Sequence, residues 1–509
     1  MRIVIEKPTI AYLHNTTPQE IEALKVQFAF ENGKIGEQLK RHKRNMSWKR
    51  KDEDGWENHK WNLEAQLHDN VLKQDGEDYY IRPASISYIE GVEYTVENRI
   101  VYPELKPLPW KEELEFTPYP YQHESIKELL KIGHGNVALP TGCGKSFILL
   151  YLARVIGESI VVVTPSKAIF RELLVEFQKM LGKSNVGGYG DGLKCIKKPI
   201  TIAIGKSITM LKKDTPQYDF FAAKQALLVD ESHTWGADGL ESISHGVLAD
   251  APRRFFMSAT QTRGDGTIKL LQSIIGKTVV EMSIEEAIDK KYLCPLKFYV
   301  KQLRSLSTAS NRSPIERGRK TRLNERDPLD CKRRHYLYNT EIAKFYANIA
   351  NAMWKVEGES TLILVEELSQ IQMLTELLDV PFGYIHSGSK KDAAKWGLEK
   401  VDLTTEIERF NRGEIRVLIG TKAIATGTNM YCTHNTCNWI GGSSEILTKQ
   451  GPMGRSTRWM KKKFAQFHKP KTHSKIWDVD VIGQQILGSM LKRRVQYYEE
   501  TGETVTSIV

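Results

Sequence analysis

The chain has 509 residues, of which 40% are hydrophobic and 27% are charged, and its formal net charge is +11. A chain of this length is expected to hold roughly two to four domains, and no apolar run approaches the roughly 18 residues that span a bilayer. The start of the chain lacks a signal peptide's apolar stretch, and the six scattered cysteines give no disulfide framework. We therefore expect a monomeric cytoplasmic protein without a membrane partner. The excess of basic residues suits a polyanionic binding partner.

Residues 1–115 are predicted to form a small, separate α+β domain. Arg2–Glu6 alternates like a strand, Thr17–Phe30 reads as a helix capped by Thr16 or Thr17, and Tyr79–Tyr94 reads as strands broken by a glycine. The proline-rich stretch Pro103–Pro120 then predicts a linker.

A basic stretch, Lys40–Lys60, predicts a loop or hairpin within this domain. Its cations are interleaved with tryptophan, a combination that suits nucleic-acid phosphates and bases together. The alternative is a solvated charged face. The residues assigned to docking are Arg41, Lys43, Arg44, Trp48, Lys49 and Arg50.

From Tyr119 onward, apolar strands alternate with amphipathic helices, which predicts a parallel sheet with crossover helices. Val137–Phe147 reads V-A-L-P-T-G-C-G-K-S-F and lies where a strand meets a helix. Free backbone N–H groups and the helix dipole favour a phosphate at such a point. The full phosphate-loop pattern requires glycine at position 139, where this chain has Leu139. The alternative is a glycine-rich turn with a surface lysine.

Within this loop, Lys145 would add a positive charge for the β- and γ-phosphates and the Ser146 hydroxyl would ligate Mg²⁺. The nucleotide-binding residues are therefore expected to be Thr141, Gly142, Cys143, Gly144, Lys145 and Ser146. Upstream, Gln122 carries both a donor and an acceptor, as reading an adenine edge requires, although a lone glutamine is more often a surface residue.

Two further polar segments follow buried strands. Asp230 and Glu231 end the apolar strand Ala226–Val229, where one carboxylate can hold Mg²⁺ and the next can polarise the attacking water. Ser258, Ala259 and Thr260 follow another strand and could couple a nucleotide site to a moving neighbour, or form a simple turn.

A polar, basic stretch at about residues 300–335 predicts a domain break, and a second alternating region follows it. There, Arg416–Gly420 leads into Thr421 and Thr426, whose hydroxyls would make a backbone clamp for nucleic-acid phosphates. Arg455 and Arg458 are three residues apart on a predicted helix, so they share a face and could present guanidinium groups to a γ-phosphate. They can act only if a second domain closes over the nucleotide of the first.

This ordered set of motifs resembles the superfamily-two helicases and translocases, over roughly residues 119–480. The resemblance implies an α/β fold of two tandem RecA-like domains with ATP and Mg²⁺ as cofactors. It makes Gln122 the adenine reader, Lys145 part of the phosphate loop, Asp230 the Mg²⁺ holder and Glu231 the catalytic base. It further implies coupling by Ser258, Ala259 and Thr260, arginine fingers at Arg455 and Arg458, and a backbone grip by Thr164, Pro165, Thr421 and Thr426.

The expected organisation is an accessory DNA-binding domain (1–115), a first RecA-like domain (116–298), a basic linker (299–335), a second RecA-like domain (336–482) and a helical tail (483–509). The sequence D-E-S-H and the small basic domain are similar to the bacteriophage UvsW-type helicases, which act on forks and Holliday junctions. The family's last motif places glutamine at 451, whereas this chain has Gly451 with Gln450 before it.

The resemblance predicts an ATP-dependent enzyme that moves along single-stranded or branched DNA in recombination, repair or replication. Two alternatives stay open. One is an ATP-gated clamp that grips nucleic acid without unwinding it, and the other is an RNA helicase.

Overall fold

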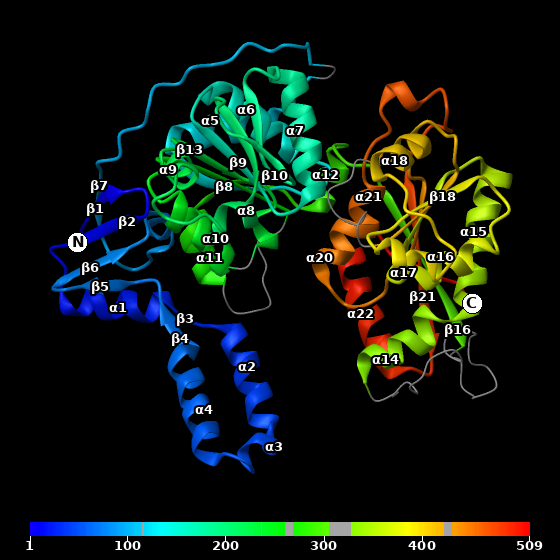
Figure 1. Cartoon of the computed structure of the whole chain (residues 1–509), viewed down its shortest axis with the longest axis horizontal. Helices are drawn as coiled ribbons and strands as arrows, with labels where there is room; N and C mark the ends of the chain where they lie inside the picture. The colour runs from blue at the N-terminus through cyan, green and yellow to red at the C-terminus, as the bar shows by residue number, and fades with distance from the viewer. Residues whose placement is uncertain (115–116, 236, 260–267, 305–326, 422–429, 509) are drawn as a thin grey trace. The chain divides into compact units, whose positions relative to one another are not determined.

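The computed structural model describes the chain except for residues 115–116, 236, 260–267, 305–326, 422–429 and 509. The chain divides into two compact units: the first holds Met1–Leu139 with Gly144–Glu281, and the second holds Pro140–Cys143 with Met282–Val509. Helices flank a sheet in each unit (Figure 1). Among the described residues, no helix is both long and apolar enough to cross a membrane.

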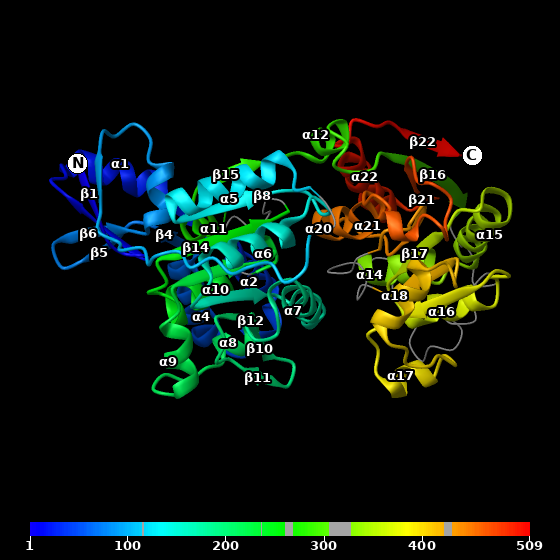
Figure 2. The same ribbon diagram turned by 90° about the horizontal axis from the view of Figure 1, so that it is seen from above.

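The larger sheet of the first unit has the order β11-β10-β12-β9-β13-β14-β8-β15, and its described pairings are parallel except β10 with β11. Its central strands are apolar on both sides because helices cover both faces (Figure 2). The strands are β8 (His134–Ala138), β9 (Ile160–Thr164), β10 (Val186–Gly190), β11 (Leu193–Cys195), β12 (Ile200–Ile204), β13 (Ala226–Val229), β14 (Arg253–Ser258) and β15 (Thr278–Glu281). The helices are α5 (Pro120–Ile132), α6 (Lys145–Ile156), α7 (Lys167–Leu181), α8 (Gly205–Thr209), α9 (Pro216–Ala222), α10 (Ala237–Glu241) and α11 (Ile268–Ile275).

The sheet of the second unit has the order β18-β19-β17-β20-β21-β16-β22, and its described pairings are parallel. Its strands are β16 (Leu296–Arg304), β17 (Thr361–Val365), β18 (Phe382–Ile385), β19 (Val417–Gly420), β20 (Asn435–Trp439), β21 (Ser474–Ile482) and β22 (Val505–Ile508). Its helices are α12 (Ile284–Asp289), α14 (Pro328–Lys332), α15 (Thr340–Glu357), α16 (Leu368–Thr375), α17 (Lys390–Ala394), α18 (Leu403–Asn411), α20 (Glu445–Thr448), α21 (Gly454–Ser456) and α22 (Gln485–Glu499). The predicted fold class, tandem parallel-sheet α/β domains, is confirmed.

The N-terminal part of the first unit is a mixed sheet with a helical hairpin. The sheet order is β5-β6-β2-β1-β7, and α1 begins at the predicted cap Thr17, whose side chain forms a capping box with Glu20. A short β3–β4 ladder carries the hairpin of α2, α3 and α4, which projects from the sheet (Figure 1). The elements are β1 (Arg2–Lys7), β2 (Ile10–His14), α1 (Pro18–Phe28), β3 (Ala29–Glu31), α2 (Gly33–Arg44), α3 (Met46–Lys49), α4 (Glu53–Leu67), β4 (His68–Asn70), β5 (Lys73–Asp75), β6 (Asp78–Ile81) and β7 (Thr95–Asn98).

This N-terminal part is anchored to the rest of the first unit by polar contacts around α11. Lys269 Nζ donates to Gln27 O at 2.7 Å, the Tyr88 hydroxyl donates to Gly276 O at 3.0 Å, and Arg82 donates to Ser273 Oγ at 2.9 Å. The predicted linker is also held, since Lys106 N–H donates to Ile156 O at 3.1 Å. The linker therefore lies along the end of α6 instead of crossing solvent.

The structure differs from the predicted boundaries at several places. The second unit begins at Met282 and not after residue 298, and α14 lies inside the predicted linker 299–335. Residues 299–304, predicted as the start of a linker, belong to β16, which pairs with β21 and β22. The charges of β16 misled the prediction, because they alternate with the buried residues Leu296, Phe298 and Val300. The predicted helical tail contains α22 and also the strand β22, which extends the sheet at its edge.

Candidate functional site

The predicted phosphate loop lies between β8 and α6. Gly142 and Gly144 have φ angles of +101° and +78°, a region that favours glycine, and Gly144 is the N-cap of α6. A Cβ atom added at Gly144 would lie 2.4 Å from Gln122 Nε2. The chain can therefore turn tightly at a helix N-terminus, which is where a phosphate binds well.

Leu139, the departure from the loop pattern, has a structural role. Its side chain is fully buried, its N–H donates to Ser258 O at 2.9 Å, and its carbonyl accepts from Lys145 Nζ at 3.0 Å. The Lys145 side chain is buried and Ser146 beside it is half-buried. A leucine can occupy the first loop position because it packs in the core and holds the lysine through its backbone.

Asp230 and Glu231 follow β13 as predicted. Asp230 is 4% exposed, and its carboxylate accepts from the Glu231 N–H at 3.0 Å. Burial, together with the Glu231 charge, raises the pKa of Asp230 to about 7, and the Lys145 charge opposes this rise. Such a carboxylate gains a favourable partner when a cation such as Mg²⁺ binds, so the donor set fits the metal.

The backbone connects these segments to the predicted coupling motif. Ser232 Oγ donates to Met257 O at 3.0 Å, and Ser258 is buried at the end of β14, where its carbonyl accepts from Leu139. The half-buried Ala259 follows, while Thr260 lies outside the described residues. The phosphate loop, the acidic pair and the end of β14 therefore lie together.

Gln122 is not a surface residue, so the alternative considered for it is wrong. It is 3% exposed on α5, and its Oε1 accepts from the Tyr119 N–H at 2.9 Å. Together with its proximity to Gly144, this places an amide next to the phosphate loop. Its role as adenine reader stays a prediction.

Thr164 and Pro165 lie at the end of β9. Thr164 is fully buried, and its hydroxyl donates to Ser166 O and Ala203 O, both at 3.4 Å. Pro165 is half-buried. The grip role of Thr164 and Pro165 stays a prediction.

In the second unit, a hollow of about 880 Å³ lies at the carboxyl ends of β17, β18 and β19. Its wall contains Thr421, half-buried Trp396, and two cations paired with carboxylates: Arg333 with Glu367 at 3.1 Å, and Lys395 with Asp392 at 3.2 Å. Thr421 is 6% exposed, and Thr426 lies outside the described residues. Polar groups at the carboxyl ends of parallel strands are typical of ligand sites in open α/β sheets.

Arg455 lies at the end of a helical stretch, but Arg458 lies beyond it, so the prediction that the two arginines share a face of one helix is wrong. Arg455 in α21 is 1% exposed, and Arg458 just beyond it is half-buried. The preceding turn, Lys449–Met453, is a π-helix. A π-helical turn holds one more residue than an α-helical turn, which accounts for the one-residue displacement of Gln450.

The basic stretch forms the α2–α4 hairpin. Arg41, Lys43, Arg44 and Arg50 are exposed, and two of them take part in surface ion pairs, Arg41 with Glu37 at 3.6 Å and Lys43 with Glu64 at 3.0 Å. Such pairs contribute little and are readily exchanged for phosphates. Lys49 instead bonds Glu57 at 3.0 Å and lies over the Trp56 ring.

Aromatic residues fill the space between the hairpin helices. His42 stacks on Trp56 with ring centroids 4.6 Å apart, and Trp48 lies edge-on to His42 at 4.9 Å. The predicted base-stacking residue Trp48 is thus partly engaged inside the hairpin. The sequence analysis missed Trp61 on α4, which is 69% exposed and which the charges around it had masked.

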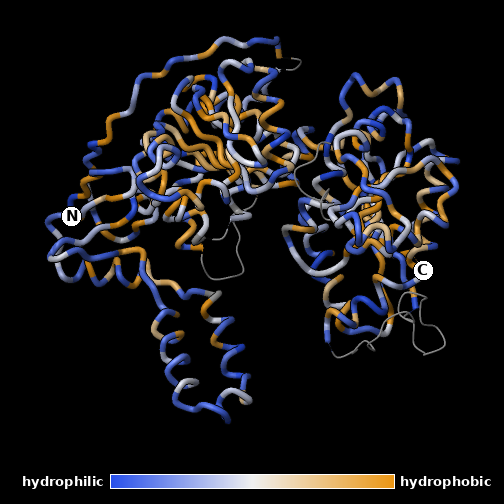
Figure 3. Tube along the Cα trace, viewed as in Figure 1, coloured by the Kyte–Doolittle hydropathy of each residue, from blue (hydrophilic) through white to orange (hydrophobic). Residues whose placement is uncertain are grey.

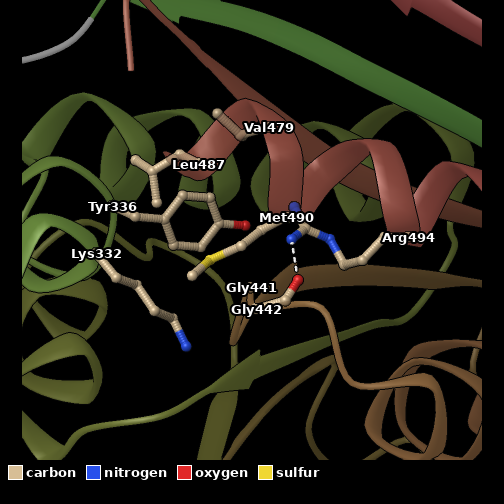
Figure 4. A pocket seen from close by; sticks show the side chains of 8 residues that line it. All are labelled: Lys332, Tyr336, Gly441, Gly442, Val479, Leu487, Met490 and Arg494. Atoms are coloured by element: carbon tan, nitrogen blue, oxygen red, sulfur yellow. Dashed lines mark hydrogen bonds between the residues drawn. The ribbon is translucent and has the colours of Figure 1, made fainter. Parts of the chain in front are cut away.

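A buried polar network in the second unit was also missed. Asp478 accepts from Arg494 Nε at 2.7 Å and Nη2 at 2.9 Å, and from the Tyr498 and Tyr336 hydroxyls at 2.8 and 3.2 Å. Figure 4 shows Arg494 bonded to Gly442 O beside a cavity of about 10 Å³, room for about one water molecule. The sequence signal that could have indicated this network is Asp478, a charged residue at an inward position of the strand β21.

Two protein-family models match the chain. The model for the res subunit of type III restriction enzymes matches residues 115–263, and the helicase conserved C-terminal domain matches residues 343–439. The two matches fall on the two large sheets and include the phosphate loop and the acidic pair.

Known proteins agree with these matches. The DNA 3'-5' translocase XPB2 of Sulfurisphaera tokodaii is 24% identical over 331 residues, which are 61% of this chain and 72% of that protein. An HsdR-subunit fragment of a type I restriction enzyme from Vibrio vulnificus has a TM-score of 0.52 at 16% identity, covering 79% of this chain and 70% of that one.

The match to the structure of T4 UvsW covers 100% of this chain and 99% of that one, with 14% identity and a TM-score of 0.43. The finer resemblance to UvsW-type helicases therefore stays a prediction. The two family matches and the 24% identical translocase support the assignment of the chain to the superfamily-two helicases and translocases, which are ATP-dependent enzymes.

Proposed function

We propose that the protein is an ATP-driven DNA translocase or helicase that prefers branched DNA such as forks and four-way junctions. The observation that carries this proposal is the α2–α4 hairpin, a largely hydrophilic arm of the unit that also holds Lys145 and Asp230 (Figure 3). Its cations Arg41, Lys43, Arg44 and Arg50 are exposed. A projecting cationic hairpin can contact one duplex arm while the motor acts on another. The 24% identity to a protein named a DNA translocase supports DNA as the substrate.

In this proposal the residues of the first unit bind and orient the nucleotide. The N-terminus of α6 and the Lys145 ammonium bind the phosphates, Asp230 holds Mg²⁺, and Glu231 orients the attacking water. Magnesium-bound ATP supplies the phosphoryl group that is transferred to water. Arg455 and Arg458 balance the charge that develops, and closing and reopening of the two units moves the DNA.

The direct test measures ATP hydrolysis at one salt concentration with no nucleic acid, single-stranded DNA, duplex DNA, a four-way junction and RNA. We expect stimulation by DNA, greatest with the junction. Stimulation by RNA alone would contradict the DNA assignment, and equal rates in all five reactions would contradict the motor. A strand-displacement assay then separates a helicase from a clamp, because a clamp hydrolyses ATP without displacing a strand.

The hairpin has its own test in the variant Arg44→Glu/Arg50→Glu. Because each arginine would neutralise a phosphate, the slope of log affinity against log salt for junction DNA should fall by about 2. The matched control Lys212→Glu/Lys213→Glu makes the same charge change at exposed positions of the same unit. Equal slopes for the two variants would show that the hairpin is only a solvated surface.

A further inference from the structure

The segment 452–459, which carries Arg455 and Arg458, is held by buried hydrogen bonds to its backbone. Thr457 O accepts from the Cys294 N–H at 2.6 Å, and Ser456 O accepts from Ser474 Oγ at 2.9 Å. The Ser456 hydroxyl in turn donates to Pro452 O at 2.7 Å. Two different parts of the second unit, at Cys294 and Ser474, therefore converge on this short segment.

A buried lysine makes the strongest of these contacts. Lys471 is 7% exposed, and its ammonium donates to Ser456 O at 2.6 Å and to Arg458 O at 2.7 Å. A cation at the end of a helix complements its dipole and satisfies carbonyls that have no helical donor. Charge-assisted bonds of this length are roughly twice as strong as neutral ones.

Burying the Lys471 ammonium removes it from water and so costs solvation free energy. Burying an ammonium costs several kcal/mol unless strong acceptors replace water. A neutral donor such as the nearby Ser474 hydroxyl already reaches Ser456 O, so the fold has a cheaper way to cap that carbonyl. Only the lysine also reaches the carbonyl of Arg458 among the hydrogen bonds described, which ties its charge to the arginine itself.

We propose that Lys471 is a positioning residue for Arg458: its ammonium fixes the carbonyls of Ser456 and Arg458 and thereby sets how the Arg458 guanidinium group is presented. The inference rests on the proposed function, in which the arginines stabilise charge on the nucleotide. Because Lys471 is 7% exposed and its ammonium bonds two backbone carbonyls, it acts in this proposal through Arg458. Its effect should therefore appear in the rate constant of hydrolysis and not in nucleotide affinity.

Deprotonation of the Lys471 ammonium should weaken its bonds to Ser456 O and Arg458 O in alkaline solution. Burial lowers the pKa of Lys471 to about 8; the neighbouring Cys294 and Cys432 thiols favour its charged form, whereas Arg458 opposes it. His434 also faces it, with a pKa lowered by burial and by the Lys471 charge, and burial raises the pKa of Cys432 to about 12. The ammonium is present below about pH 8 and is lost above it, so the clamp weakens as pH rises.

The experiment is a double-mutant cycle on the full chain with Lys471→Met and Arg458→Ala, measured as DNA-stimulated kcat and KM for ATP. We expect Lys471→Met to lower kcat roughly 10- to 100-fold, because a small misplacement of a catalytic group has effects of that size, with KM nearly unchanged. The double variant should be no slower than Arg458→Ala alone. Additive losses would overturn the proposal, because a residue that only supports the fold acts independently of Arg458.

Matched variants complete the design. Lys224→Met removes another buried lysine, whose pKa burial also lowers to about 8, and it should leave kcat unchanged. Ser474→Ala removes the neutral donor to Ser456 O and should lower kcat only a few-fold, because Lys471 still holds that carbonyl. If Arg458→Ala keeps the wild-type kcat, the arginine role itself fails. If it loses activity while Lys471→Met does not, only the positioning inference fails.

The wild-type pH profile tests the proposal even if Lys471→Met does not fold. At saturating ATP and DNA, kcat should be constant up to about pH 8 and fall above it, and Arg458→Ala should lack this alkaline decline. A flat wild-type profile up to about pH 9.5, or an equal decline in both proteins, would overturn the proposal.

Discussion

Two buried aspartates on parallel strands, Asp230 after β13 and Asp478 in β21, have opposite surroundings. Asp478 is 1% exposed and accepts hydrogen bonds from Arg494, Tyr336, Tyr498 and Asn438. Asp230 is 4% exposed, and within the described chain its carboxylate accepts one hydrogen bond, from the next N–H. The Asp478 carboxylate is therefore saturated by hydrogen bonds within the protein, whereas the Asp230 carboxylate can still bind a ligand.

The electrostatics follow the same division. Burial alone would lower the pKa of Arg494, but the Asp478 charge outweighs it and the pKa is raised, so the pair is charged together. At Asp230, burial and the Glu231 charge together raise the pKa to about 7. A carboxylate whose ionised form is destabilised by the fold is a mark of a functional site, whereas one paired inside a network is a mark of structure.

The largest change is expected from Lys145→Ala. The lysine would bind the phosphates, and its charge also favours ionised Asp230, so its loss should lower DNA-stimulated ATP hydrolysis on the order of 10²- to 10³-fold. DNA binding without nucleotide should be nearly unchanged, as measured by fluorescence anisotropy. Wild-type hydrolysis in this variant would remove the phosphate loop from the mechanism and with it the contrast between the two aspartates.

Breaking the saturated network should affect stability instead of catalysis. Arg494→Met leaves Asp478 buried without its cation, which costs about 3–5 kcal/mol of unfolding free energy. Arg493→Met is the matched control, because Arg493 is exposed on the same helix and should change stability by less than about 0.5 kcal/mol. Urea unfolding of both variants measures the difference. Equal stabilities would mean that the Asp478 network is not structural.

The sequence predicted the strands and the nucleotide residues because each has a local signal. The predicted apolar strand Ala226–Val229 matches β13 residue for residue, and Gly144 and Lys145 lie at a helix N-terminus as predicted. In such cases periodicity, turn chemistry and motif spacing all depend on neighbouring residues.

Lys40–Lys60 was predicted as a loop or hairpin, but the helices of the α2–α4 hairpin were not predicted, because they bury few apolar residues. His42 and Trp56 are buried between its helices, but in the sequence they stand among charged residues, which hides their place in the core. The network around Asp478 was missed for a related reason: its donors lie 16 to 142 residues away along the chain, and no local pattern joins them. Lys471 likewise has no local signal, because the carbonyls that it contacts lie 15 and 13 residues before it in the chain.

Gln450 shows a third reason why the sequence alone does not determine the site. Counting residues displaces Gln450 from its motif position, but the π-helix Lys449–Met453 absorbs the additional residue. Spacing rules assume regular helices, so an insertion that the backbone accommodates cannot be distinguished in sequence from a lost motif.

The last prediction concerns Asp230→Asn and tests whether the site stores electrostatic strain. Because the folded-state pKa of Asp230, about 7, exceeds its unfolded value of about 3.9, the folded protein loses stability as pH rises from the unfolded value towards about 7. The substituted asparagine cannot ionise, so the nucleotide-free variant should melt a few degrees above the wild type at about pH 8 and at nearly the same temperature at about pH 4. Asp219→Asn, at an exposed position, is the control and should not change the melting temperature.

Magnesium-bound ATP should stabilise the wild type more than the Asp230→Asn variant, because only the wild type gains a cation for its carboxylate. A variant that melts below the wild type at the alkaline pH would mean that Asp230, like Asp478, stabilises the fold.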